Sequence, residues 1–138
     1  MKIGFTGSRH GMTKVQHARA TGIMLSENVK ECLHGGCVSA DAEFHKICLS
    51  IGSIAISVFR GHPTGQPNYT KYWGKLASSI NVAHIEPAPF LERNRRIVNN
   101  CDLLIATPST DSSKGKGGTW YTIGYAKDND VPVLVLRR

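Results

Sequence analysis

Short apolar runs of β type alternate along this chain with segments in which apolar residues recur every three or four positions. The apolar runs predict six strands, at residues 2–6, 31–34, 53–59, 81–85, 102–106 and 131–136. The other segments predict helices over 14–28, over 89–99, from Thr119 onward, and around an apolar face that includes Ala40, Phe44 and Ile51. This alternation favours an α/β fold with a doubly wound, mostly parallel six-stranded sheet, a Rossmann-like three-layer sandwich.

Several helix boundaries carry their own signals. Thr13 and Gln16 have the spacing of a capping box, so we expect Thr13 to cap the first helix, and Thr119 to cap the last. Pro89 suits the first turn of its helix, because that turn leaves its N–H groups unpaired and proline has none. The expected buried face of the first helix consists of Val15, Ala18, Gly22, Leu25 and Val29.

The connections between strands predict their order. Right-handed crossovers place the first strand centrally, which gives the order 3-2-1-4-5-6 with the topological switch point between strands one and four. Residues 60–79 interrupt the alternation with glycines, prolines and three aromatic residues, Tyr69, Tyr72 and Trp73. Because aromatic side chains are costly to expose, this segment is expected to form a lid, a dimer contact or part of the core.

Three glycine-bearing turns each follow a predicted strand and open a predicted helix. They contain Gly7, the pair Gly35 and Gly36, and the pair Gly117 and Gly118. Glycine lets backbone N–H groups approach a ligand, and a helix N-terminus offers unpaired N–H groups with a partial positive charge. Because the carboxyl ends of parallel strands share one edge, the turns predict a crevice there for a phosphate-bearing small molecule.

Polar residues in these turns are candidates for ligand contact. Ser8 and Arg9 add a hydroxyl and a guanidinium to the first turn, although Arg9 fits an exposed loop charge equally well. Asp41 stands in the first turn of a helix, where the helix dipole alone favours a carboxylate. Its functional interpretation is a ribose-hydroxyl acceptor or a general base. For His34 and His45, which fall nearby, a hydrogen-bonded structural role is favoured over catalysis.

The helix that follows Pro89 carries a polar residue on its apolar stripe. Asn94 falls one turn after Phe90, so its amide must find a partner in the backbone or in a ligand. Arg93 borders the stripe, whereas Arg95 and Arg96 lean toward solvent. We therefore expect Arg93 to reach the crevice.

Composition limits the functional classes. The 138 residues, 41% of them hydrophobic, suit a single domain over 1–138. A glycine-rich start and the absence of any apolar run near ~18 residues predict a soluble, cytoplasmic protein without a membrane partner. The four cysteines lack zinc-site spacing, so we expect reduced, buried thiols and neither metal nor cofactor. The net charge of +7 suggests an anionic partner or simply a solvated surface; because the basic residues are scattered, a nucleotide is favoured over nucleic acid.

Several motifs together resemble one known group of proteins. The runs GFTGSR at 4–9, HGGCVSAD at 34–41, CDLLIA at 101–106 and GGT at 117–119, with Arg93 between the second and third, look like the SLOG superfamily. This superfamily includes the lonely-guy (LOG) phosphoribohydrolases, DprA-like Rossmann domains and many small phage or bacterial proteins. The resemblance spans nearly the whole chain. It implies a Rossmann-like nucleotide-binding domain that forms a homodimer or a higher homo-oligomer.

In the hydrolase branch of the superfamily, an arginine and a glutamate serve the N-glycosidic bond that is cleaved. The resemblance assigns the arginine to Arg93 and the Gly-Thr of the glutamate motif to Gly118 and Thr119. The glutamate position itself falls on Thr122, and a threonine cannot accept a proton at neutral pH as a carboxylate does. The expected ligand contacts are Gly7, Ser8, Arg9, Gly35, Gly36, Asp41, Arg93, Asn94, Pro108, Gly117, Gly118 and Thr119.

Two further departures from the superfamily stand out. Residues 109–116 form an insertion before the last glycine pair, and Ser39 stands where small phage relatives tend to carry glycine. Two functions remain open. The first is binding of a nucleoside phosphate or an ADP-ribose-like signal, as a sensor or sponge in conflict between phage and bacterium. The alternative is a phosphoribohydrolase or nucleosidase that uses Asp41 or Glu92 in place of the missing glutamate.

Overall fold

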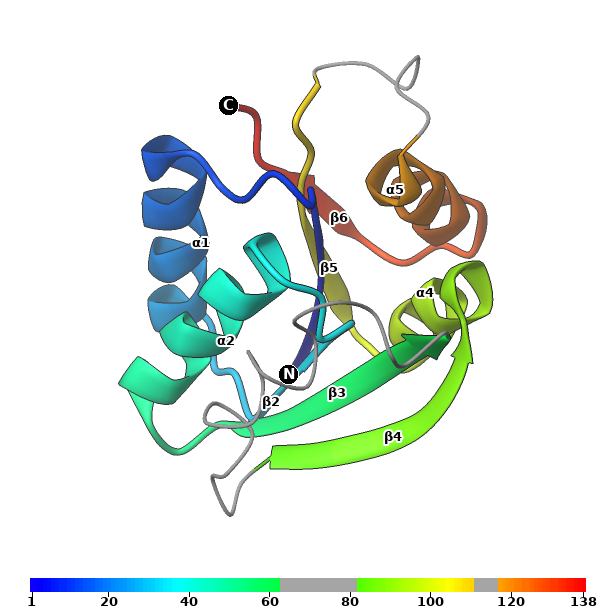
Figure 1. The fold of residues 1–138 in the computed structure, drawn as a ribbon. Helices are drawn as coiled ribbons and strands as arrows, with labels where there is room; N and C mark the ends of the chain where they lie inside the picture. Colours follow the sequence, from blue (N-terminus) through cyan, green and yellow to red (C-terminus); the bar gives the residue numbers. More distant parts are fainter. Residues whose placement is uncertain (63–81, 111–116) are drawn as a thin grey trace.

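The computed structural model describes residues 1–62, 82–110 and 117–138 (Figure 1). Tyr69, Tyr72 and Trp73 lie outside the described residues. The predicted alternation of strands and helices is confirmed. In chain order the elements are β1 (Lys2–Gly7), α1 (Lys14–Ser26), β2 (Glu31–His34), α2 (Ala40–Ile51), β3 (Ala55–His62), β4 (Val82–Pro89), α4 (Phe90–Asn99), β5 (Leu103–Thr107), α5 (Gly118–Asp128) and β6 (Val133–Val135).

The six strands form one parallel sheet in the order β4-β3-β2-β1-β5-β6. Helices α1 and α2 cover one face and α4 and α5 the other, which gives the expected three layers (Figure 1). The strand order expected from the sequence is wrong in one respect. The fourth strand lies at the sheet edge beside β3, so the switch point is between β1 and β5.

The composition of β4 explains this edge position. The strand contains Glu86 and two prolines, Pro87 and Pro89. Proline cannot donate a hydrogen bond to a sheet and is confined largely to edge strands. In contrast β5 is an apolar run, and its register pairs Ile3 with Leu103 and continues to the end of β1. The strand that fits beside β1, with neighbours on both sides, is therefore β5.

Side chains alternate between two apolar clusters, one on each face of the sheet. On the α1 and α2 side, Phe5 of β1 stacks on Phe44 of α2 with ring centroids 4.3 Å apart. On the other side, Leu104 of β5 packs with Ile97 of α4. All four cysteines are free thiols; Cys32 and Cys48 are buried, while Cys37 and Cys101 are half-buried, so the expectation of burial is wrong for these two.

Helix α1 begins as predicted but buries a different face. The capping box is present, since Gln16 N–H donates to Thr13 Oγ1 at 3.1 Å and Thr13 N–H donates to Gln16 Oε1 at 2.9 Å. The buried residues are Gln16, Ala20 and Met24, whereas Val15 and Leu25 of the expected face are exposed. Gln16 is buried because its Nε2 donates to the main-chain carbonyls of Pro108 and Leu136, at 2.9 Å each.

Helix α5 begins without the predicted cap. Thr119 lies inside the first turn, and Gly117 is the N-cap residue, which has no side chain to accept a hydrogen bond. Pro89 also sits one position earlier than predicted, at the N-cap of α4. The first N–H groups of α5 therefore have no side-chain cap and remain able to bind an anion.

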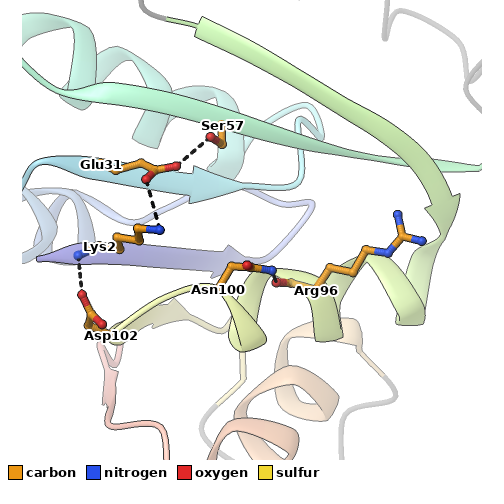
Figure 2. A network of polar contacts seen from close by, with 6 residues as sticks. All are labelled: Lys2, Glu31, Ser57, Arg96, Asn100 and Asp102. Atoms are coloured by element: carbon orange, nitrogen blue, oxygen red, sulfur yellow. Dashed lines mark hydrogen bonds and ion pairs between the residues drawn. The ribbon is translucent and has the colours of Figure 1, made fainter.

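Polar contacts join the strands at the amino edge of the sheet (Figure 2). Lys2 Nζ lies 3.7 Å from Glu31 Oε2, and Ser57 Oγ donates to Glu31 Oε1 at 2.9 Å. The backbone N–H of Lys2 donates to Asp102 Oδ2 at 2.8 Å. These side chains thus hold β1, β2 and β3 and the start of β5 in register, at the end of the sheet opposite the glycine turns.

Candidate functional site

A cavity of about 430 Å³ opens at the carboxyl edge of the sheet, at the switch point between β1 and β5. Its walls come from the turns after β1, β2 and β5 and from the helices α2, α4 and α5. All the ligand contacts expected from the sequence line this cavity except Gly36. The three glycine turns therefore meet at one place, because the parallel sheet brings the ends of their strands together.

The first turn is held tightly between β5 and α2. A Cβ on Gly7 would lie 2.5 Å from Ala40 Cβ and 2.6 Å from Thr107 Oγ1, so only glycine fits there. Ser8 is buried; its N–H donates to the Thr107 carbonyl at 3.2 Å, and its Oγ accepts from His10 N–H at 3.0 Å. The Ser8 hydroxyl also has a hydrogen to donate. Arg9 is exposed where it lines the cavity.

Two histidines lie behind the second turn, His34 at the end of β2 and His45 in α2, and both have the hydrogen-bonded structural role favoured from the sequence. His34 and His45 are fully buried, and neither lines the cavity. Gly36 N–H donates to His34 Nδ1 at 3.0 Å, which leaves the proton of a neutral His34 on Nε2, where it is donated to His45 Nδ1 at 2.9 Å. Gly36 itself has φ +68°, so glycine serves the shape of this turn.

Arg93 spans the back of the cavity from α4. Its side chain is buried, with Nη1 donating to the Gly35 carbonyl at 2.6 Å and to the Phe59 carbonyl at 3.2 Å. Its Nε donates to Asn94 Oδ1 at 2.7 Å. The amide oxygen of Asn94 thus has the neighbouring arginine as its partner, where the sequence had suggested backbone or ligand. The other arginines of α4 point elsewhere, since Arg95 Nη1 donates to the Tyr121 hydroxyl.

Burial raises the pKa of two acidic groups beside Arg93, Asp41 and Cys37. Asp41 Oδ2 accepts from Cys37 N–H at 3.1 Å, and burial raises the pKa of the Asp41 carboxyl above 3.8, although the charge of Arg93 and these hydrogen bonds oppose the rise. Arg93 Nη2 lies 3.5 Å from Cys37 Sγ. Burial still raises the pKa of this thiol to about 11, so Cys37 is not a thiolate at neutral pH. Asp41 lies in the first turn of α2, where the helix dipole favours a carboxylate, and it also lines the cavity.

The third turn contributes the start of α5. Gly117, Gly118 and Thr119 line the cavity, and a Cβ on Gly118 would lie 3.4 Å from Asn94 Nδ2. Thr122, the position to which the resemblance assigns the hydrolase glutamate, is buried and does not line the cavity; its Oγ1 donates to the Gly118 carbonyl at 2.7 Å. Thr122 therefore closes the first turn of its own helix.

Sequence reasoning missed several wall residues. Thr6, His10, Cys37, Thr110 and Trp120 all line the cavity. Thr6, His10, Cys37 and Trp120 directly flank residues of the glycine turns, so a window of two residues around each turn would have found them. Thr110 is two residues after Pro108, in the segment that follows β5. Glu92, one of the two carboxylates suggested to replace the missing glutamate, is not part of the cavity wall; its side chain pairs with Arg96 at 3.2 Å.

No protein-family model matches the chain, and no curated protein matches it significantly. Within residues 1–62, 82–110 and 117–138, no helix is long and apolar enough to cross a membrane. The same residues contain no group of three or more His, Cys, Asp or Glu side chains that could hold a metal ion. The cavity is therefore the basis for assigning a function.

Proposed function

We propose that this chain binds a nucleotide-derived small molecule, a nucleoside phosphate or an ADP-ribose-like compound, in the cavity at the switch point. The observation that carries the proposal is the start of α5, whose first N–H groups lack a side-chain cap and line the same cavity as Ser8, Arg9 and Arg93. Helix N-termini, hydroxyls and guanidinium groups are the donors that bind phosphate in proteins. The cavity volume falls within the range of about 300–1,000 Å³ typical of small-molecule sites.

The ligand is held without being cleaved. In the hydrolases of the SLOG superfamily a glutamate is needed, and Thr122 takes its position here with its hydroxyl bonded to Gly118. A missing general acid or base typically costs about 10²–10⁴-fold in rate. The proposal includes membership of that superfamily, assembly as a homo-oligomer in the cytoplasm, and a role as sensor or sponge of a nucleotide signal.

One observation favours the alternative, cleavage of an N-glycosidic bond. Asp41 lines the cavity near Arg93, and burial raises its pKa, which suits a carboxylic acid that protonates a leaving base. Glu92 lies outside the cavity wall, so Asp41 is the carboxyl group that this alternative requires.

Thermal-shift titration tests the binding proposal with AMP, ADP-ribose, NAD and cyclic nucleotides. A ligand at a hundred times its Kd should stabilise the protein by about 2.7 kcal/mol. Arg9→Ala should reduce the shift, whereas Arg19→Ala, an equal loss of charge on the exposed face of α1, should not. The proposal fails if no member of the panel shifts the melting temperature while short single-stranded DNA does.

Chromatography of free adenine released from AMP and isopentenyl-AMP separates binding from cleavage. Wild type should release no more adenine than the buffer control. Rapid release that Asp41→Asn abolishes would instead assign the chain as a hydrolase with Asp41 as its acid. Thr122→Glu is the reciprocal variant, because it restores the carboxylate that the hydrolase branch carries at this position.

A further inference from the structure

Trp120 is the large aromatic side chain of the cavity wall that the proposed contacts leave unused. It lies in the first turn of α5, two residues after Gly118, and is half-buried. Phe5 also lines the cavity, but its ring is fully buried and stacked on Phe44 in the core. Among the described residues of the wall, Trp120 is therefore the one with a large aromatic surface still partly open.

The polar edge of this indole is already bonded within the protein. Trp120 Nε1 donates to the Thr110 carbonyl oxygen at 3.2 Å and lies 3.1 Å from Thr110 Oγ1. These contacts join the start of α5 to the segment after β5 and fix the direction of the ring. Because the only hydrogen-bond donor of the side chain is used, what Trp120 offers a ligand is the flat face of the ring.

The rest of the described wall supplies mainly donors for phosphate; its apolar residues Phe5, Ile97 and Pro108 are buried, and the exposed ring of His10 is smaller than an indole. The turns contribute backbone N–H groups and the Ser8 hydroxyl, and Arg9 and Arg93 contribute charge. Stacking of a base on an aromatic side chain contributes about 1–3 kcal/mol and tolerates any base, because every base has a π-face.

We propose that Trp120 stacks on the base of the bound nucleotide, so that the cavity selects nucleotides over sugar phosphates of the same charge. This inference rests on the proposed function, since it names the part of the ligand that the cavity recognises. It predicts that the binding free energies of a nucleoside monophosphate and of ribose 5-phosphate differ by the contribution of one stacked base.

Calorimetric titration with AMP, GMP, CMP, UMP and ribose 5-phosphate tests the inference. Wild type should bind at least one nucleotide about 10-fold more tightly than ribose 5-phosphate, since 1.4 kcal/mol is a factor of ten. Trp120→Leu should remove that preference and leave the Kd for ribose 5-phosphate unchanged, while Trp120→Phe keeps most of it. Tyr121 is an aromatic residue of the same helix outside the cavity wall, so Tyr121→Leu should keep the preference for the nucleotide entirely.

Fluorescence gives an independent measurement. The chain has two tryptophans, so Trp73→Phe leaves Trp120 as the only one. The preferred nucleotide should quench its emission and ribose 5-phosphate should not. Equal affinity of wild type for ribose 5-phosphate and the nucleotides, or an equal loss of both in Trp120→Leu, would overturn the stacking role and leave phosphate binding intact. Failure of all five probes and of the wider nucleotide panel would overturn both proposals.

Discussion

The Nη1 atom of Arg93 donates a hydrogen bond to the carbonyl oxygen of Gly35 at 2.6 Å. The two residues are 58 positions apart in the chain, and the bond joins α4 to the turn after β2 at the back of the cavity. A Cβ built on Gly35 would overlap this same nitrogen. Gly35 and Arg93 therefore depend on each other: the guanidinium fills the space that any other residue at position 35 would need.

Gly35→Ala should lower the free energy of unfolding by about 2 kcal/mol. The added methyl group pushes the buried guanidinium away from the Gly35 and Phe59 carbonyls, and hydrogen bonds of a charged group contribute about 1.5–3 kcal/mol each. Urea unfolding measures the change. Gly22→Ala in α1 is the matched control; nothing lies within 4 Å of its added Cβ, so it should stabilise the protein by about 0.5–1 kcal/mol. Equal effects of the two variants would contradict this dependence.

Asp41 should make the protein lose stability as the pH rises. Burial raises the folded-state pKa of Asp41 above 3.8, so the folded protein holds this proton more tightly than the unfolded chain. The resulting stability is fully present below the unfolded pKa and is lost as the pH rises through the folded pKa. The difference in free energy of unfolding between wild type and Asp41→Asn, followed by urea titration at a series of pH values, should therefore decline with rising pH. A constant difference would show that Asp41 titrates alike in both states.

Ser39→Gly should stabilise the fold by about 1 kcal/mol. Ser39 is the N-cap residue of α2, with φ 72° and ψ −115°, and its side chain makes no capping hydrogen bond. A non-glycine residue in such a conformation costs about 1–3 kcal/mol, from which the greater entropy of glycine in the unfolded chain is subtracted. Ser39→Ala keeps the Cβ and loses the hydroxyl, so it should bring no gain. Differential scanning calorimetry of both variants decides whether backbone conformation is the cause.

Thr107→Val should raise the free energy of unfolding by about 1 kcal/mol. Thr107 is fully buried at the end of β5, and its Oγ1 has no hydrogen-bond partner among the described residues, so valine of the same shape removes an unpaired polar group. Thr122→Val is the control of opposite sign, because the Thr122 hydroxyl donates to the Gly118 carbonyl at 2.7 Å. If both variants lose stability in urea titrations, Thr107 has a partner in solution.

The sequence by itself determined the strands and helices and the edge of the sheet at which the glycine turns meet. Apolar runs and helical spacing located every strand and helix that the structure describes, and the capping box at Thr13 and Gln16 marked the start of α1. These signals are local, since each depends on residues a few positions apart. The convergence of the glycine turns followed from parallel pairing alone, because that pairing puts all strand ends on one side.

The tertiary structure decided what depends on contacts between distant residues. The position of β4 at the sheet edge depended on β5 being the strand that pairs with β1, although the prolines of β4 already indicated an edge strand. The buried face of α1 was set by Gln16, whose amide is needed by carbonyls about a hundred residues away. In the same way the Arg93 guanidinium is buried where Gly35 leaves room for it, and Trp120, which lines the cavity, is hydrogen-bonded to Thr110 across the segment before α5. Such pairings join residues that no local pattern connects, so only the folded chain brings them together.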